Sequence, residues 1–170
     1  LNLSGDPEFA VLLEGPWGSG KSYFVDVYFR ERLDKLRMKD QDAKDPLIRV
    51  TLFGVRDLSD ITTQMFEKAH PVLGGKTVKI LNNIGSRLGG IVGLNSDAKE
   101  NASFLENMVL NLKDRILVFD DLERSPLPIV DVMGFINRFV EHDKLKVIVV
   151  ASEQDIPKDQ QEEYNARKEK

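Results

Sequence analysis

The residues best suited to chemistry in this sequence form a glycine-rich run that ends in lysine and serine. In chain order they are Gly15, Pro16, Trp17, Gly18, Ser19, Gly20, Lys21 and Ser22. They fit the phosphate-binding pattern G-x-x-x-x-G-K-[ST], in which glycines leave the backbone N–H groups open to a phosphate. Lys21 would bring positive charge to the β- and γ-phosphates, and the Ser22 hydroxyl would coordinate Mg²⁺. The pattern therefore predicts a site for a nucleoside triphosphate with its magnesium ion.

The segments on either side of this phosphate loop (residues 15–22) support the interpretation. Residues 9–13 form an apolar stretch of strand length, and residues 23–33 contain no glycine or proline, which favours a helix. The residues at helical spacing in the second stretch are Phe24, Val27, Tyr28 and Glu31. A phosphate would lie at the N-terminus of that helix, beside Tyr23, because free N–H groups and the helix dipole favour an anion there. The alternative is an ordinary glycine-rich turn with a surface lysine.

A second informative stretch is an apolar run, residues 116–119, that ends in Asp120 and Asp121. Ligands of open α/β sheets bind outside the carboxyl ends of the strands, so a strand here would deliver both acids beside the phosphate loop. We assign Asp120 to Mg²⁺ and Asp121 to the water that attacks the phosphate, with Glu123 as second choice for the water. Taken alone, two aspartates after a strand are equally a turn signal. Their pairing with the phosphate loop favours the metal site.

Two further apolar runs, residues 47–53 and 146–151, predict the remaining strands of the sheet. Ser152 follows the second run, where a polar residue would sense the γ-phosphate; the alternative for Ser152 is a helix cap or a turn former. Apolar residues also recur at helical spacing in three places. These predicted helices follow the N-cap candidates at 57–61 and lie within residues 104–112 and 129–140.

Residues 72–95 are the least readable part of the sequence, because six glycines interrupt apolar and charged residues. We reject a membrane span here, since such a span needs about 18 or more nearly uncharged apolar residues. Two interpretations stay open. The segment is either a mobile insertion or partner-docking hairpin, or a glycine-softened helix that covers the sheet.

The composition is that of a soluble globular protein, with 170 residues, 41% hydrophobic and 31% charged. We expect one domain with its core in residues 9–156 and an exposed helix or frayed polar tail at 158–170. No cysteine is present, which excludes disulfides and thiolate metal sites, and nothing resembles a signal peptide, so we expect a cytoplasmic location. The net charge of -4 does not indicate a nucleic-acid partner. The first residue, Leu1, and the charged end suggest a fragment of a longer protein.

Together, the phosphate loop with Trp17, the Asp-Asp-Leu-Glu-Arg run at 120–124 and the strand that ends in Ser152 resemble the KAP family of P-loop NTPases. The resemblance covers residues 9–156. It implies an α/β three-layer sandwich with a parallel sheet, in which the 146–151 strand lies between the phosphate-loop strand and the Asp120 strand. The chain would stop before a fifth strand and a lid. Adenine is favoured over guanine by the family and by the absence of an Asn-Lys-x-Asp signature.

The sequence departs from the family pattern at Glu123, where aspartate is common, at Ser152, where Asn or Asp is frequent, and at 72–95, which is too polar for the membrane helices of many members. The leading hypothesis is an ATP-binding and hydrolysing switch that controls assembly of a larger protein, as in bacterial defence systems, through self-association or partner domains. A small-molecule kinase and a structural nucleotide-binding scaffold are the alternatives. Arg124 either pairs with its own acids or faces a neighbouring subunit, so we expect slow hydrolysis by the isolated chain.

Overall fold

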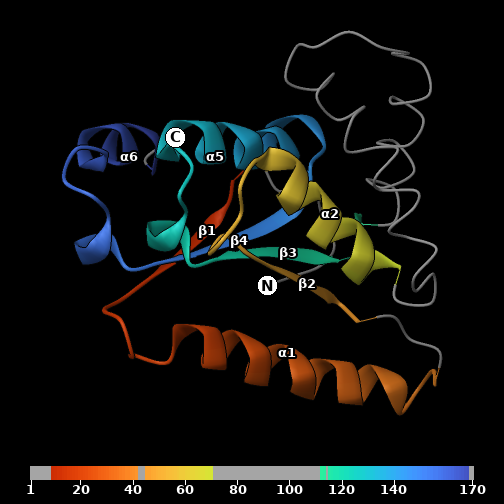
Figure 1. The fold of residues 1–170 in the computed structure, drawn as a ribbon. Coiled ribbons are helices and arrows are strands. Elements are labelled where there is room, and N and C mark those ends of the chain that lie inside the picture. Colours follow the sequence, from red (N-terminus) through yellow and green to blue (C-terminus); the bar gives the residue numbers. More distant parts are fainter. Residues whose placement is uncertain (1–8, 42–44, 71–111, 114, 169–170) are drawn as a thin grey trace, which may run out of the picture.

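The computed structural model describes residues 9–41, 45–70, 112–113 and 115–168 (Figure 1). Their strands form one parallel sheet in the order β1-β4-β3-β2. The strands are β1 (Val11–Glu14), β2 (Leu47–Thr51), β3 (Ile116–Asp120) and β4 (Lys146–Ala151). This order confirms the predicted sheet, because β4 lies between the phosphate-loop strand and the strand that ends in Asp120.

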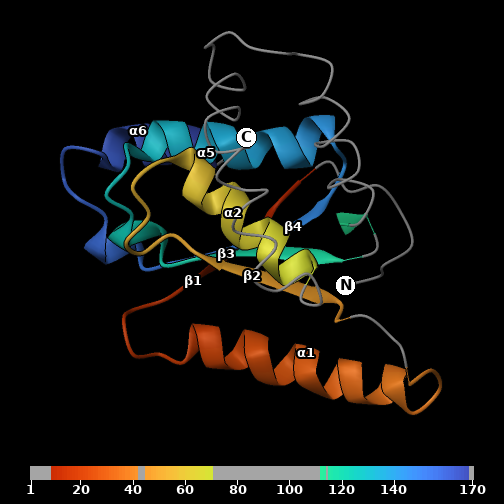
Figure 2. The same cartoon turned by 45° about the vertical axis from the view of Figure 1, so that its right-hand side comes forward.

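Helices cover both faces of the sheet, which gives the three layers expected from the sequence (Figures 1 and 2). One face carries α1 (Lys21–Arg37), and the other carries α2 (Leu58–Ala69), α5 (Ile129–Asn137) and α6 (Gln161–Lys168). A π-helical turn, Arg138–His142, continues α5. Short 3-10 turns follow the two central strands, Leu122–Arg124 after β3 and Glu153–Asp155 after β4.

The core divides into two layers because successive side chains of a strand point to opposite faces. On the α1 side, Val118 and Ile148 pack with Val25 and Phe29 of the helix. The opposite layer is larger and includes Phe119, which stacks on Phe139 with ring centroids 6.2 Å apart. All five residues of β3 are buried, which explains its continuous apolar sequence.

The first helix is present as predicted, but its buried face differs from the set of residues singled out by helical spacing. The buried residues of α1 are Val25, Phe29 and Leu33, at i, i+4 and i+8, whereas Phe24 and Tyr28 are 60% and 42% exposed. Their exposed rings stack on each other instead, with centroids 6.1 Å apart. The sequence places large apolar residues on both sides of this helix. The packing of Val25 and Phe29 against β3 and β4 decides which side meets the sheet.

Part of the segment expected to be an exposed helix or frayed tail, residues 161–168, is a helix with mostly exposed side chains. These residues form α6, and Tyr164 is only 2% exposed because it packs into the larger core layer. The preceding Gln160 accepts a hydrogen bond from the backbone N–H of Ile129, at 2.7 Å, and so caps the N-terminus of α5. A buried aromatic ring, the Gln160 amide and an ion pair between Lys168 and Glu153 at 2.7 Å connect this mostly polar segment to the rest of the domain.

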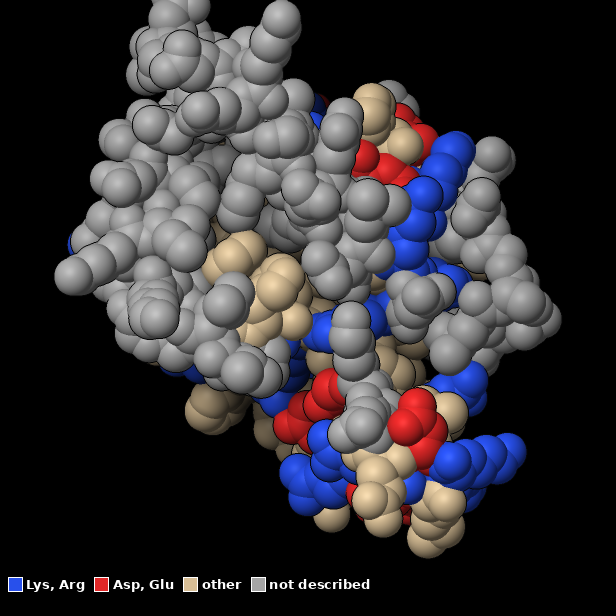
Figure 3. All heavy atoms as spheres, turned by 90° about the vertical axis from the view of Figure 1, so that its right-hand side faces the viewer, with Lys and Arg blue, Asp and Glu red and all other residues tan. Residues whose placement is uncertain are grey.

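The segment 72–95 and most of the predicted helix at 104–112 lie outside the described residues. Within the described part of the chain, no helix is both long and apolar enough to cross a membrane. Figure 3 shows acidic and basic side chains interspersed on the described surface of one face.

Candidate functional site

The phosphate loop adopts backbone angles that require glycine at two positions. Gly18 and Gly20 have φ angles of 78° and 86°, in the left-handed region that other residues rarely adopt. Gly20 immediately precedes α1, and its carbonyl accepts the hydrogen bond of Phe24 N at 2.8 Å. A second bond, from Ser19 N to the Pro16 carbonyl at 3.2 Å, closes the turn. The loop therefore makes a tight turn and leads directly into the helix.

The first turn of α1 is left open for an anion. No side chain caps it, and it contains no acidic residue. The first turn of α2 differs in both respects. The Asp57 side chain accepts hydrogen bonds from Ser59 N and Asp60 N, and Asp60 is an acidic residue within the turn. The positive end of α1 thus keeps its N–H groups and its partial charge for a ligand.

Lys21 is the first residue of α1 and turns its ammonium group toward the loop. Its Nζ donates hydrogen bonds to the carbonyl oxygens of Gly15, at 2.7 Å, and Pro16, at 3.1 Å. These are neutral acceptors, so a phosphate oxygen that carries charge would be a stronger partner for the same ammonium.

Asp120 ends β3 with its carboxylate 2% exposed. One oxygen, Oδ1, accepts a hydrogen bond from Asp121 N at 2.9 Å, and Oδ2 forms an ion pair with Nη2 of Arg49. Asp121 has a positive φ of 63°, which turns the chain sharply after the strand. Its Oδ2 accepts a hydrogen bond from the Thr51 hydroxyl at 3.1 Å, and its Oδ1 lies 3.7 Å from Nη1 of Arg124.

Ser152 is fully buried and lies at the end of β4 as predicted. Its hydroxyl donates a hydrogen bond to Asp155 Oδ2 at 2.6 Å, and its backbone N–H donates to Glu123 Oε2 at 3.0 Å. The hydroxyl therefore serves the turn after β4, in line with the turn-former alternative. Contact of Ser152 with a γ-phosphate stays a prediction.

A cavity of about 230 Å³ brings the loop and the acids together. Its lining residues are Trp17, Gly18, Gly20, Lys21, Ser22, Tyr23, Asp120, Asp121, Glu123 and Val150. Four residues of the predicted site do not line it, namely Gly15, Pro16, Ser19 and Ser152. Ser22 and Asp120 supply a hydroxyl and a carboxylate, the oxygen donors that suit Mg²⁺. The residues present therefore fit the ion that the loop pattern implies.

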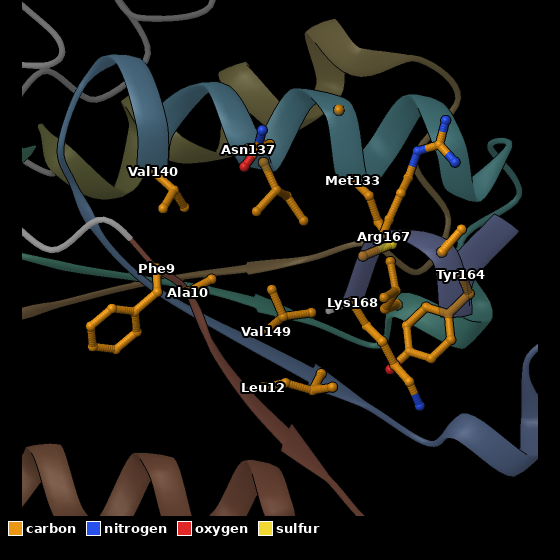
Figure 4. A pocket seen from close by; sticks show the side chains of 14 residues that line it. Phe9, Ala10, Leu12, Met133, Asn137, Val140, Val149, Tyr164, Arg167 and Lys168 are labelled. Atoms are coloured by element: carbon orange, nitrogen blue, oxygen red, sulfur yellow. The ribbon is translucent and has the colours of Figure 1, made fainter. Parts of the chain in front are cut away.

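A larger cavity of about 540 Å³ lies between β1, α5 and α6 (Figure 4). Its lining includes Leu12, Met133 and Val140, together with Arg167 and Lys168 at its α6 end. None of the residues assigned to phosphate or metal lines this cavity. The smaller cavity, which those residues share, is therefore the candidate site.

Arg49 is the site residue that the sequence reasoning missed. Its Nη1 lies 2.6 Å from Asp26 Oδ2 on α1, while its Nη2 holds Asp120. Partial burial lowers the pKa of Arg49, but the carboxylates of Asp120 and Asp26 outweigh burial and raise it above its ordinary value. The sequence contained one sign of this role, namely a charged residue within a mostly apolar strand, two residues before the strand ends. Its partners are far away in sequence, so the pattern alone does not name them.

A glycine-rich loop, an uncapped helix start and a buried aspartate at a strand end share one pocket. This combination is typical of P-loop nucleotide-binding domains. Residues 1–79 match the model of the KAP family P-loop domain. This match agrees with the family that the motifs resemble and supports an NTPase-like, nucleotide-binding function. The KAP match contains the phosphate loop, α1, β2 and α2, whereas Asp120, Asp121 and Glu123 lie beyond it. A comparison with curated proteins found no match.

Proposed function

We propose that this chain is an ATP-binding and hydrolysing switch module, whose nucleotide state controls the assembly or conformation of a larger protein. The observation that carries the proposal is the shared pocket of Lys21, Ser22 and Asp120, in which a phosphate-binding loop faces a metal-binding carboxylate. The alternative, an ordinary glycine-rich turn, does not account for a buried aspartate of β3 that lines the same pocket as the loop.

In the proposed complex, the phosphates lie at the open N-terminus of α1. The Lys21 ammonium exchanges the carbonyls of Gly15 and Pro16 for oxygens of the β- and γ-phosphates. Ser22 and Asp120 would hold Mg²⁺, Asp120 through water, and the bound ion would supply positive charge beside the phosphates.

Asp121 is the proposed acceptor of the water proton. Its carboxylate lines the pocket, and the Thr51 hydroxyl and Arg124 hold it from the side of β2 and of the following turn. Fixing the carboxylate in this way limits its rotation, which favours a defined position for the water. Glu123 lines the same pocket and is the second candidate.

Slow hydrolysis is expected because both arginines beside these acids are already engaged. Arg49 joins Asp26 and Asp120, while the guanidinium of Arg124 lies 3.9 Å from the centre of the Phe53 ring and beside Asp121. An arginine that neutralises the transition state accelerates phosphoryl transfer by about 10³ to 10⁵. We expect such a residue to come from a second chain, so that turnover rises as chains associate.

The test is a multiple-turnover phosphate-release assay over a broad concentration range, on this chain and on the full-length protein that carries it. The expected result is slow turnover that rises with concentration, and that changes when Arg124→Ala is mixed into wild type. Binding without turnover at any concentration would favour the structural scaffold. A phosphorylated small molecule in place of free phosphate would favour the kinase. Fast turnover by a chain shown to be monomeric would refute the dependence on association.

A further inference from the structure

Arg49 places a positive charge against the carboxylate that is proposed to hold Mg²⁺. It is paired in register with Val118 of β3, whose side chain packs against α1, so Arg49 points to the α1 face. Asp120 is two residues after Val118 and points to the same face. On this face the guanidinium divides its two terminal nitrogens between Asp120 and Asp26.

We infer that Arg49 is the resident counter-ion of Asp120 and competes with Mg²⁺ for this carboxylate, and that Asp26 holds the guanidinium when the metal ion takes its place. Arg49 is thus a positioning residue that sets the affinity for Mg²⁺. The inference rests on the proposed function, because it concerns the same metal site.

The burial of Asp120 is the reason that it needs a counter-ion. Its carboxylate is 2% exposed, and a buried carboxylate without a partner destabilises the folded state strongly. Each of its oxygens already has a protein partner: Oδ1 accepts a hydrogen bond from Asp121 N, and Oδ2 forms an ion pair with Arg49. A divalent cation at the pocket side of this carboxylate would lie close to the guanidinium, and the two like charges repel.

Asp26 is positioned to keep an ion pair with the Arg49 guanidinium after Arg49 has separated from Asp120. Asp26 is four residues after Ser22, the other proposed Mg²⁺ ligand. Both side chains therefore lie on the same face of α1. Its side chain is 38% exposed, compared with 2% for Asp120, so an Arg49–Asp26 pair can persist near solvent. Arg49 keeps one charged partner whether or not Asp120 is occupied by a metal ion.

The experiment titrates Mg²⁺ at a fixed ATP concentration and follows the fluorescence of Trp17. Trp17 is the single tryptophan of the sequence, is 72% exposed and lines the pocket, so its emission reports binding without any turnover. Arg49→Gln should lower the half-saturating Mg²⁺ concentration about tenfold. Loss of a residue that supports a metal ligand changes metal affinity by a similar factor but weakens it, so the sign of the change distinguishes competition from support. The same variant should melt at a lower temperature than wild type when Mg²⁺ and ATP are omitted.

A double-mutant cycle separates competition from a general change in charge. Asp26→Asn should raise the half-saturating Mg²⁺ concentration, because the guanidinium then pairs with Asp120 alone. In the Arg49→Gln background the same Asp26→Asn change should have little effect, since Asp26 acts through Arg49. Arg56→Gln is the matched control, because Arg56 is an exposed arginine whose ion pair with Asp60 lies outside the pocket.

The outcomes distinguish this inference from the proposed function. If wild type gives no Mg²⁺-dependent response to ATP, the proposed function fails. If wild type responds, but Arg49→Gln lowers the melting temperature without lowering the half-saturating Mg²⁺ concentration, Arg49 is only structural and the inference is overturned. Should Arg49→Gln not fold, Arg49→Met removes the charge but keeps an unbranched side chain, and a half-saturating concentration equal to or above that of wild type overturns the inference.

Discussion

Glu123 accepts a hydrogen bond from the backbone N–H of Ser152, with 3.0 Å between Oε2 and N. This bond ties the turn after β3 to the end of β4. Asp121, two residues earlier, is held instead by the Thr51 hydroxyl at the end of β2. The two acids that could activate water are therefore anchored to different strands, so substitutions can separate their roles.

Asp121→Asn should bind ATP but hydrolyse it about 100-fold more slowly than wild type, because an amide cannot accept the proton of the attacking water. Glu123→Gln should keep most of the turnover. Single-turnover hydrolysis and ATP affinity, measured on both variants, check this division. Loss of turnover in Glu123→Gln with full turnover in Asp121→Asn would exchange the two assignments.

Lys21→Ala should abolish or greatly weaken the binding of Mg·ATP, because the ammonium is the proposed contact to the β- and γ-phosphates. The fold should persist, since within the described residues the Lys21 ammonium donates its hydrogen bonds to two carbonyls of the loop. A thermal-shift titration checks both points: ATP at about 100 times its dissociation constant stabilises a binding-competent protein by about 2.7 kcal/mol. Lys35→Ala, an exposed lysine of the same helix, serves as control and should behave as wild type. An unchanged ATP affinity in Lys21→Ala would remove Lys21 from the site.

Asp57→Ala should lower the free energy of unfolding at neutral pH by about 1 kcal/mol, since Asp57 caps α2. The Ser59 hydroxyl and the backbone N–H groups of Asp60 and Ser59 hold the pKa of Asp57 below its ordinary value of 3.8. The unfolded chain therefore takes up this proton more readily, and the charged part of the stabilisation is present above about pH 4 and lost as the pH falls below it. Denaturant titrations at neutral pH and at about pH 3 check the change.

Asp57→Asn is the matched control for this pH dependence. Asparagine keeps an oxygen acceptor for the cap but has no charge to lose. A stability difference between wild type and Asp57→Asn that grows on acidification would contradict the assigned direction.

Tyr164→Ala should lower the free energy of unfolding by about 3 kcal/mol, because it empties a buried aromatic site between α6 and the sheet. Tyr23→Ala, at a tyrosine that is 74% exposed, should change stability little. Denaturant unfolding of the two variants gives the comparison. Equal stability of both would mean that α6 does not dock through Tyr164.

The sequence by itself determined the features that depend on residues close together in the chain. The phosphate loop follows from local rules, because glycines at 18 and 20 permit the left-handed angles and the residues after them form a helix. The acids at 120 and 121 follow from an apolar strand that ends in carboxylates. The position of that strand beside β4 came from the family resemblance, and the sheet order confirms it.

Only the tertiary structure decided the features that depend on partners distant in sequence. Arg49 forms ion pairs with Asp120 and Asp26 because β2 is paired with β3 and α1 packs on the same face of the sheet. No periodicity in the sequence predicts these two contacts. The buried face of α1 was ambiguous, since aromatic residues lie on both of its sides, and packing of Val25 and Phe29 against the sheet settled it. Tyr164 docks a polar segment through one ring, which a pattern of repeated apolar residues cannot reveal. In each case, the burial of a side chain depends on what lies opposite it, which is a property of the packed molecule.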